Sequence, residues 1–363
     1  MLYAPEAFEP LTETPWDPSG VSELVREIAA DADAAFREDA LWPAHEWEAW
    51  QTPLPLQGLY AGAAGVIWAL ATLRDRGRAE PRLDLARAAR LTLEAWRREP
   101  SLMRIDLPQP AEASLLDGEA GILTVLLRLE PNDKLADRLL ELVRANANNA
   151  ADEVMWGAPG TMLAAGSLRE ATGDERWAAV WRESASALLA RRDHDGLWTQ
   201  HLHGETSRGL GPVHGAVGNV LSLLQGGELL TAEERRILED ETAALLRRTA
   251  VVEDGLANWP STEDRPLLAS DGQIRVQWDV GAPGIVASTA SYLDEDLLLA
   301  GAELAWRAGP HGDEKGAGLC HGTAGNGYAL LKAFERTQDE RWLERARRFA
   351  VHALEQATRA HEE

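Results

Sequence analysis

Cys320 and His321 form an adjacent pair of potential metal ligands inside the glycine-rich stretch Gly318-Leu-Cys-His-Gly-Thr-Ala-Gly-Asn-Gly327. Cys320 is the only cysteine among the 363 residues. A thiolate and a neutral imidazole are common zinc ligands, and glycines permit the tight turn that would aim both at one ion. The pair therefore predicts half of a metal site. The alternative is a buried structural cysteine beside a histidine that caps a helix.

A short glycine pattern recurs six times along the chain. In each copy two glycines stand three positions apart, usually with small residues between them, and an apolar run follows. The copies occupy residues 62–65, 118–121, 157–160, 215–218, 281–284 and 322–325. Self-similarity of this kind is typical of a repeat architecture in which each copy opens one structural unit.

The segments between the glycine pairs alternate between two kinds of predicted helix. Runs such as residues 66–70 and 122–127 are apolar nearly all round, which predicts buried helices. Segments such as 84–96 and 339–349 space apolar residues by three and four with charges opposite, as in a helix with one wet face. The alternation predicts an all-α fold, an α/α toroid with six to seven pairs of inner and outer helices. Strand signals are weak, and short hairpins are expected only in long loops such as 251–277.

We expect residues 1–50 to form an N-terminal extension with the first outer helix, and residues 51–363 to form the toroid as a single domain. Apolar residues make up 45% of the chain and charged residues 26%, which is typical of a folded globular protein. The formal net charge of −23 argues against binding to nucleic acid or to anionic membrane surfaces, because both require basic patches.

The same composition gives an expectation about location. No apolar run approaches the roughly 20 residues that a membrane span needs, and the first residues show no secretory signal pattern. One cysteine cannot form an internal disulfide, which fits a reducing compartment. We therefore expect a cytoplasmic protein.

In a toroid the turns that open the inner helices share one face, where helix starts expose unpaired N–H groups. Side chains that precede the glycines would converge there. Asp117, Trp156 and His214 directly precede the second, third and fourth pairs, and Asp279 lies two residues before the fifth. Trp156 is therefore a candidate to line a substrate pocket.

Four basic residues lie in the loops before these turns. Arg208 precedes the fourth turn, Arg265 and Arg275 precede the fifth, and Lys315 precedes the sixth. Each could bind a carboxylate or phosphate of a substrate, and Arg208 and Arg275 are the candidate substrate-binding residues. Ordinary surface charge is the alternative for each of them.

Five stretches together resemble the lanthionine synthetase C-like family, which includes bacterial lanthipeptide cyclases and their eukaryotic relatives. The stretches are Gly58-Leu-Tyr-Ala-Gly-Ala-Ala-Gly65, Ser114-Leu-Leu-Asp-Gly-Glu-Ala-Gly121, Pro212-Val-His-Gly-Ala-Val-Gly218, Trp278-Asp-Val-Gly-Ala-Pro-Gly284 and Leu319-Cys-His-Gly-Thr-Ala-Gly325. The segment Leu202-His-Gly204 resembles the eukaryotic relatives more than the bacterial cyclases. The resemblance spans most of the chain and implies an α/α toroid with one zinc ion.

The resemblance also implies the zinc ligands. Family members hold zinc through a Cys in a Trp-Cys-x-Gly-x-Pro-Gly motif and through a Cys-His pair, which corresponds here to Cys320 and His321. Asp279 stands where the family has the first Cys. A carboxylate is an acceptable zinc ligand, so we expect Asp279, Cys320 and His321 to form a harder and weaker site. The alternative is that Asp279 does not ligate and zinc is lost.

A further implication of the resemblance is an acid near the metal. His214 matches the family's His in the His-Gly-x-x-Gly motif, and capping of the turn is its alternative role. Bacterial cyclases carry an Asp four residues before the first glycine of the second motif, where this chain has Ser114. Asp117 is the nearest carboxylate, and Glu119 resembles an acidic residue of the eukaryotic relatives. His214 and Asp117 are therefore the candidate catalytic residues.

The chemistry implied by the resemblance is zinc-assisted addition of a thiol to dehydroalanine or dehydrobutyrine in a peptide. His214 would deliver the proton to Cα, because imidazole exchanges protons near neutral pH. The product would be a thioether, either a lanthionine ring or an adduct with a small thiol such as glutathione. The expected partners are a dehydrated peptide made by another protein and that thiol.

Two other functions remain open at this point. The change from Cys to Asp279 is compatible with a catalytically degenerate relative that binds peptides or partner proteins. A carbohydrate-active α/α toroid would instead use paired carboxylates from Asp117, Glu119 and Asp279. The Cys-His pair has no role in that second alternative.

Overall fold

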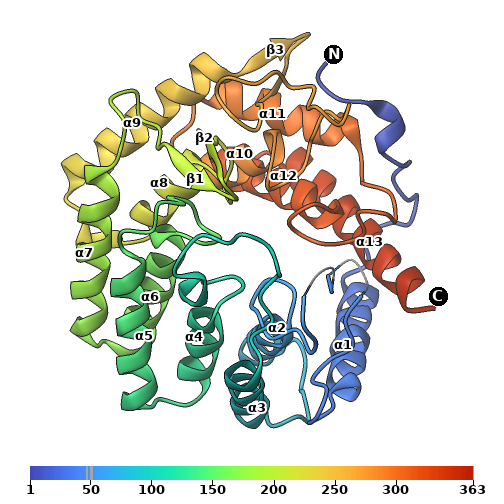
Figure 1. The fold of residues 1–363 in the computed structure, drawn as a ribbon. Coiled ribbons are helices and arrows are strands. Elements are labelled where there is room, and N and C mark those ends of the chain that lie inside the picture. Colours follow the sequence, from blue (N-terminus) through green and yellow to red (C-terminus); the bar gives the residue numbers. More distant parts are fainter. Residues whose placement is uncertain (46–47, 50–51, 363) are drawn as a thin grey trace.

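Two concentric layers of helices surround one axis (Figure 1). The computed structural model describes residues 1–45, 48–49 and 52–362. The inner layer consists of α2 (Ala63–Asp75), α4 (Glu119–Leu129), α6 (Ala158–Thr172), α8 (Ala216–Leu224), α10 (Ala282–Thr289) and α12 (Thr323–Thr337). The outer layer consists of α3 (Leu85–Arg98), α5 (Asp133–Asn146), α7 (Glu175–Ala190), α9 (Ala232–Thr249), α11 (Glu295–Ala308) and α13 (Glu340–Glu362). The predicted all-α toroid is confirmed, with six inner–outer pairs among the described residues.

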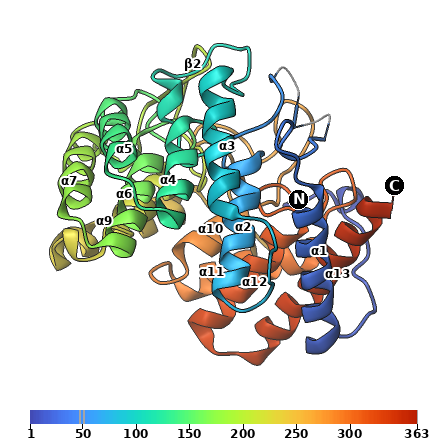
Figure 2. The same cartoon turned by 90° about the horizontal axis from the view of Figure 1, so that it is seen from below.

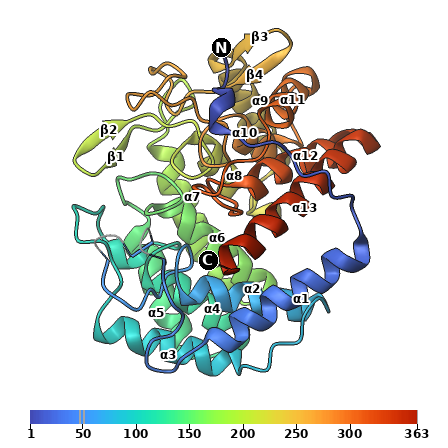
Figure 3. The ribbon, with the colours of Figure 1, turned by 90° about the vertical axis from the view of Figure 1, so that its right-hand side faces the viewer.

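Helix packing follows the order of the chain. Each inner helix contacts the next, from α2 through α4, α6, α8 and α10 to α12, and each also contacts the outer helix that follows it. The additional helix α1 (Pro18–Ala35) contacts α2 and α13, so the first α-helix of the chain packs against the last (Figure 3). Seen from below, α1, α2 and α3 lie side by side (Figure 2).

The two layers differ in burial as their sequences predict. Residues 119–127 of α4 are all buried, which explains why that stretch is apolar nearly all round. The outer helix α3 buries only one face, which includes Leu85, Leu93 and Trp96. No helix in the described part of the chain is long and apolar enough to cross a bilayer.

Two antiparallel hairpins interrupt the helical pattern. The strands β3 (Val251–Glu253) and β4 (Leu256–Asn258) pair within the long loop where a short hairpin was expected. A second hairpin joins β1 (Gln200–Leu202) to β2 (Glu205–Ser207) just before the turn that opens α8. The sequence did not predict this second hairpin, because its strand signals are weak.

The recurring glycines fix how each inner helix begins. The first glycine of every pair is the residue that directly precedes the helix. The second glycine lies against the carbonyl oxygen of the residue six positions earlier, so a Cβ at Gly160 would overlap with the carbonyl of Val154. The same close approach occurs in all six turns. It presses each entering loop onto the first helical turn and so fixes the path of the backbone before the glycines.

Two glycines of α6 test this constraint within one helix. Gly160→Ala should lower the free energy of unfolding by about 1–3 kcal/mol, because its methyl group has no space. Gly166→Ala is the matched control, since a Cβ there meets no atom within 4 Å. It should raise stability by about 0.5–1 kcal/mol through helix propensity. Equal effects of the two substitutions in urea unfolding would contradict the close-approach explanation.

Candidate active site

A cavity of about 690 Å³ opens where the starts of the inner helices meet. All six turns contribute to its wall. The contributing side chains include Tyr60 before α2, Leu116 before α4, Met155 before α6, His214 before α8, Asp279 before α10 and Cys320 before α12. The structure therefore brings the candidate metal ligands and His214 to one cavity.

Asp279, Cys320 and His321 lie together on one side of this cavity. Each offers one ligand atom, and the three atoms lie within 4.8 Å of one another. His321 Nε2 is 3.2 Å from Asp279 Oδ2 and 3.7 Å from Cys320 Sγ. The Asp279 N–H donates to the carbonyl of Cys320 at 3.1 Å, which holds the two turns in register. Oxygen, sulfur and nitrogen donors at this spacing fit a zinc ion with an open position toward the cavity.

The orientation of Asp279 has a defined cause. Gln277 Nε2 donates to Asp279 Oδ1 at 2.6 Å, which leaves Oδ2 facing His321. Hydrogen bonds with Asp279 and Cys320 raise the pKa of His321 to about 10. A divalent cation would take the place of the proton that these three groups share, because metal ligands bind in their deprotonated forms.

His214 occupies another part of the cavity wall and is held by a carboxylate. Its Nδ1 lies 2.8 Å from Oε2 of Glu153, which is completely buried. Glu153 also accepts hydrogen bonds from the N–H groups of Met155 and Trp156, at 2.9 Å and 2.6 Å. Burial alone would lower the pKa of His214, but the hydrogen bond and charge of Glu153 outweigh it and raise that pKa. His214 therefore carries a proton more readily than an ordinary histidine.

Glu153 is the functional side chain that sequence reasoning missed. The offset of four residues before the first glycine holds Ser114 in the second turn, but it holds Glu153 in the third. The signal was thus present in the neighbouring repeat. Ser114 instead connects the two turns: its hydroxyl donates to the carbonyl of Met155 at 2.6 Å and accepts from the N–H of Asp117 at 3.0 Å.

Asp117 lies in a smaller space of about 140 Å³ that shares Tyr60, Glu48 and Met155 with the main cavity. Burial, followed by the charges of Glu48 and Glu153, raises the pKa of Asp117 to about 6. The carboxyl has no hydrogen-bond or ion-pair partner among the described residues. Asp117 is thus close to the His214 pair without bonding to it.

The structure places three other predicted residues outside the cavity wall. Trp156 is buried, and its carbonyl accepts from Asn146 and Asn149. Arg208 pairs with Asp195 at 2.5 Å. Arg275 pairs with Asp271 at 2.6 Å.

Three further ionisable side chains lie in or near the turns that form the cavity. Glu119 pairs with Arg138 at 2.7 Å and does not line the wall. Lys315, from the loop before α12, does line it. Burial and the neighbouring Cys320 raise the pKa of Tyr60 well above its ordinary value, so its hydroxyl stays protonated beside the candidate metal ligands.

Comparison with known proteins agrees with the fold. Glutathione S-transferase LANCL1 of Danio rerio is 28% identical to this chain over 267 residues, which is 65% of this chain and 62% of the length of that relative. The solved structure of nisin cyclase matches with a TM-score of 0.61 at 16% identity, over 94% of this chain and 88% of that one. This structural likeness shows a shared α/α toroid.

The family model described as lanthionine synthetase C-like protein matches residues 21–361, nearly the whole chain. The match includes all six glycine turns and every residue of the candidate metal site. The resemblance inferred from five sequence motifs is thereby confirmed. The chain belongs to the lanthionine synthetase C-like family.

Proposed function

We propose that this protein binds one zinc ion through Asp279, Cys320 and His321 and adds a thiol to dehydroalanine or dehydrobutyrine in a peptide. The observation that carries the proposal is the convergence of these three ligand atoms within 4.8 Å on the wall of a cavity that also contains His214. The zebrafish relative is named a glutathione S-transferase and the structural neighbour a cyclase of nisin. Those names support a thiol and a peptide as the two reactants.

The three ligands supply complementary donors. Zinc bound here would favour the thiolate form of a substrate thiol at neutral pH. Gln277 fixes the Asp279 carboxylate, and the hydrogen bond between Asp279 and Cys320 fixes the two turns. A carboxylate in place of a thiolate donates less electron density, so the site should hold zinc less tightly than one with two cysteines.

His214 is placed to complete the reaction as an acid. Attack of the thiolate on Cβ forms the C–S bond and moves the double-bond electrons toward Cα and its carbonyl as an enolate. Protonation of Cα then gives the thioether. His214 can donate this proton from Nε2, because Glu153 holds Nδ1 at 2.8 Å and favours the protonated ring.

The remaining cavity wall is suited to a peptide. Leu59, Leu115, Leu163 and Val213 form an aliphatic surface beside the polar groups. Such a surface would pack against the substrate chain and exclude water from the enolate. The single cysteine and this thiol chemistry both suit a reducing cytoplasm.

Asp279 also supports a second candidate function. If the carboxylate binds zinc too weakly for occupancy in cells, the same cavity would bind a peptide without reacting with it. Metal content separates the two candidates, because only the first requires zinc in the purified protein.

Substitutions at the metal site give the first test. Elemental analysis of the untagged protein should find about one zinc per chain, and Cys320→Ala should abolish it because the only sulfur ligand is lost. Asp279→Cys should tighten zinc binding at least about tenfold, since a thiolate is a stronger donor. Full zinc occupancy in Cys320→Ala, or unchanged affinity in Asp279→Cys, would place these residues outside the metal site.

Substitutions of His214, the proposed proton donor, and of its partner Glu153 give the second test. The substrates are a synthetic dehydroalanine peptide and glutathione. His214→Asn should lower the rate of addition about 10²–10³-fold while zinc content stays constant. Activity of the parent should fall as the pH rises through the raised pKa of His214, because the donated proton is then absent. In Glu153→Gln the negative charge is lost, so this fall should begin at lower pH.

Glu119→Gln is the matched control for the acid test. Glu119 is also a buried carboxylate near the start of an inner helix, but its partner is Arg138 and it does not line the cavity. Its substitution should leave the pH profile of addition unchanged. A shift in that profile equal to the shift in Glu153→Gln would remove the basis for assigning Glu153 a specific role.

A further inference from the structure

Asp152, the residue before Glu153, has an unusual backbone. It is buried and adopts a left-handed conformation with φ of 43°, which a residue with a side chain seldom occupies. Such a conformation persists only when surrounding contacts enforce it. The peptide unit that leads into Glu153 is therefore held by contacts elsewhere.

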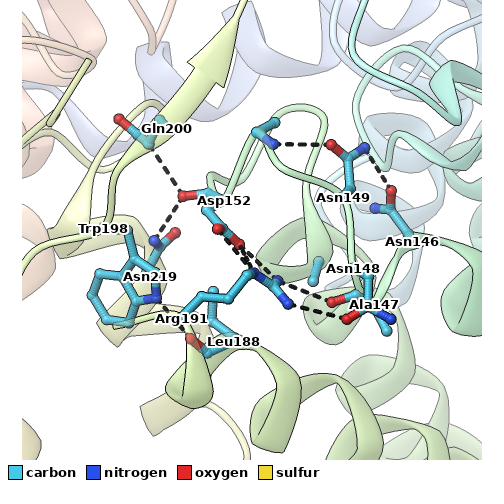
Figure 4. A network of polar contacts seen from close by, with 12 residues as sticks. Asn146, Ala147, Asn148, Asn149, Asp152, Leu188, Arg191, Trp198, Gln200 and Asn219 are labelled. Atoms are coloured by element: carbon cyan, nitrogen blue, oxygen red, sulfur yellow. Dashed lines mark hydrogen bonds and ion pairs between the residues drawn. The ribbon is translucent and has the colours of Figure 1, made fainter. Parts of the chain in front are cut away.

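Arg191 supplies the first of these contacts (Figure 4). This residue ends α7, and its guanidinium binds the Asp152 carboxylate through Nη2 at 2.8 Å and Nε at 3.0 Å. The same guanidinium donates to the carbonyl of Ala147 at 3.0 Å and to Oδ1 of Asn148 at 3.2 Å. One cation thus connects α7 to both ends of the loop between residues 147 and 152.

The carbonyl of Asp152 is held as firmly as its side chain (Figure 4). It accepts hydrogen bonds from Gln200 of β1 at 3.1 Å and from Asn219 of α8 at 2.8 Å. Both donors are almost completely buried. One residue further on, the Val154 N–H donates to the carbonyl of Val213 at 2.9 Å. Glu153 therefore lies between two residues whose backbones are fixed.

The hydrogen bonds of Glu153 depend on the fixed position of its backbone. Its buried carboxylate has no arginine or lysine partner among the described residues. Two backbone N–H groups and His214 compensate its charge. The distances of 2.6–2.9 Å allow little movement before these bonds fail. None of Asp152, Arg191, Gln200 and Asn219 lines the cavity, so their effect on it is indirect, and the backbone of Asp152 connects all of them to Glu153.

We propose that Arg191 and Asp152, with Gln200 and Asn219, are positioning residues that set the Glu153 carboxylate against His214. The catalytic role of these positioning residues rests on the proposed thiol addition, in which His214 is the acid. The geometric claim concerns only the Glu153–His214 hydrogen bond. It can be tested without any reaction.

The test compares Arg191→Ala with Arg192→Ala. Arg192 is the adjacent residue, is more buried than Arg191 and makes a similar ion pair, but its partner is Glu241 on the outer surface. Side-chain ¹⁵N NMR of the purified metal-free chain would follow the titration of His214, assigned by its loss in His214→Asn. Asp117, Asp279 and His321 also act on His214 and are the same in both variants.

In Arg191→Ala the pKa of His214 should fall below that of the parent, because burial remains while the Glu153 hydrogen bond loosens. In Arg191→Lys the pKa of His214 should fall less than in Arg191→Ala. An ammonium can reach Asp152, but it cannot also bind Ala147 and Asn148. Arg192→Ala should leave the titration unchanged even if it lowers stability as much. With dehydroalanine peptide and glutathione, kcat should fall about 10–100-fold in Arg191→Ala with little change in KM.

An unchanged His214 titration in folded Arg191→Ala would overturn the proposal and leave the network a purely structural role. If Arg191→Ala does not fold, Arg191→Lys and Asp152→Asn give the same comparison, and parental titration in both would overturn it. Failure of the thiol-addition function shows itself differently. In that case the parent lacks activity, or His214→Asn retains it, whatever the NMR titrations show.

Discussion

The close approach of a glycine to a backbone carbonyl is the contact on which the rest of this structure depends. It recurs in all six turns and admits no side chain at the second glycine. Each turn therefore enters its inner helix in the same way, and the residues before the glycines face the same end of the toroid. Six separate segments thereby build one cavity, although no two neighbouring turns are closer than 39 residues in sequence.

Two separate groups of ionisable side chains carry the proposed chemistry in that cavity. Asp279, Cys320 and His321 bring three potential ligand atoms within 4.8 Å of one another at the junction of two turns. The buried carboxylate of Glu153 and the partly exposed ring of His214 form a hydrogen-bonded pair from two other turns. The aliphatic surface beside them lowers the local dielectric, which strengthens both sets of interactions. A thiol and an electrophile bound between the two groups would have a site of activation and a proton donor.

The Glu153–His214 pair needs more support than the candidate metal site. Cys320 and His321 are adjacent, and one backbone hydrogen bond ties them to Asp279. Glu153 and His214 are 61 residues apart, and no arginine or lysine in the described part of the chain pairs with the carboxylate. Asp152, Arg191, Gln200 and Asn219 supply what is missing by fixing the backbone on one side of Glu153. This difference explains why a dense polar network lies behind the third turn (Figure 4).

The sequence predicts those features of the fold and site that depend on local constraints. The six glycine pairs mark the starts of the inner helices because the backbone approach requires glycine at fixed spacing. Cys320 and His321 are recognisable because they are adjacent. Glu153 is different: an acidic or hydroxyl residue stands at the same offset in two of the six turns, Ser114 in the second and Glu153 in the third, and only packing decides which one meets His214.

Charged residues in loops were the hardest to place. The chain has 59 acidic residues against 36 basic ones, so most arginines find a carboxylate nearby. Arg208 and Arg275 do so outside the cavity wall. Trp156 stands directly before a turn but is enclosed by the residues that hold that turn. Position next to a motif therefore predicts proximity to the site, and it does not predict which way a side chain points.

The most direct test of the central claim is the zinc K-edge X-ray absorption spectrum of the zinc-loaded protein, recorded with and without glutathione. The account predicts one sulfur at about 2.3 Å with nitrogen and oxygen ligands at about 2.0–2.2 Å. A second sulfur should appear when glutathione binds at the open position. A spectrum without sulfur would contradict the assignment of Cys320, and an unchanged sulfur count with saturating glutathione would contradict thiol activation at this site.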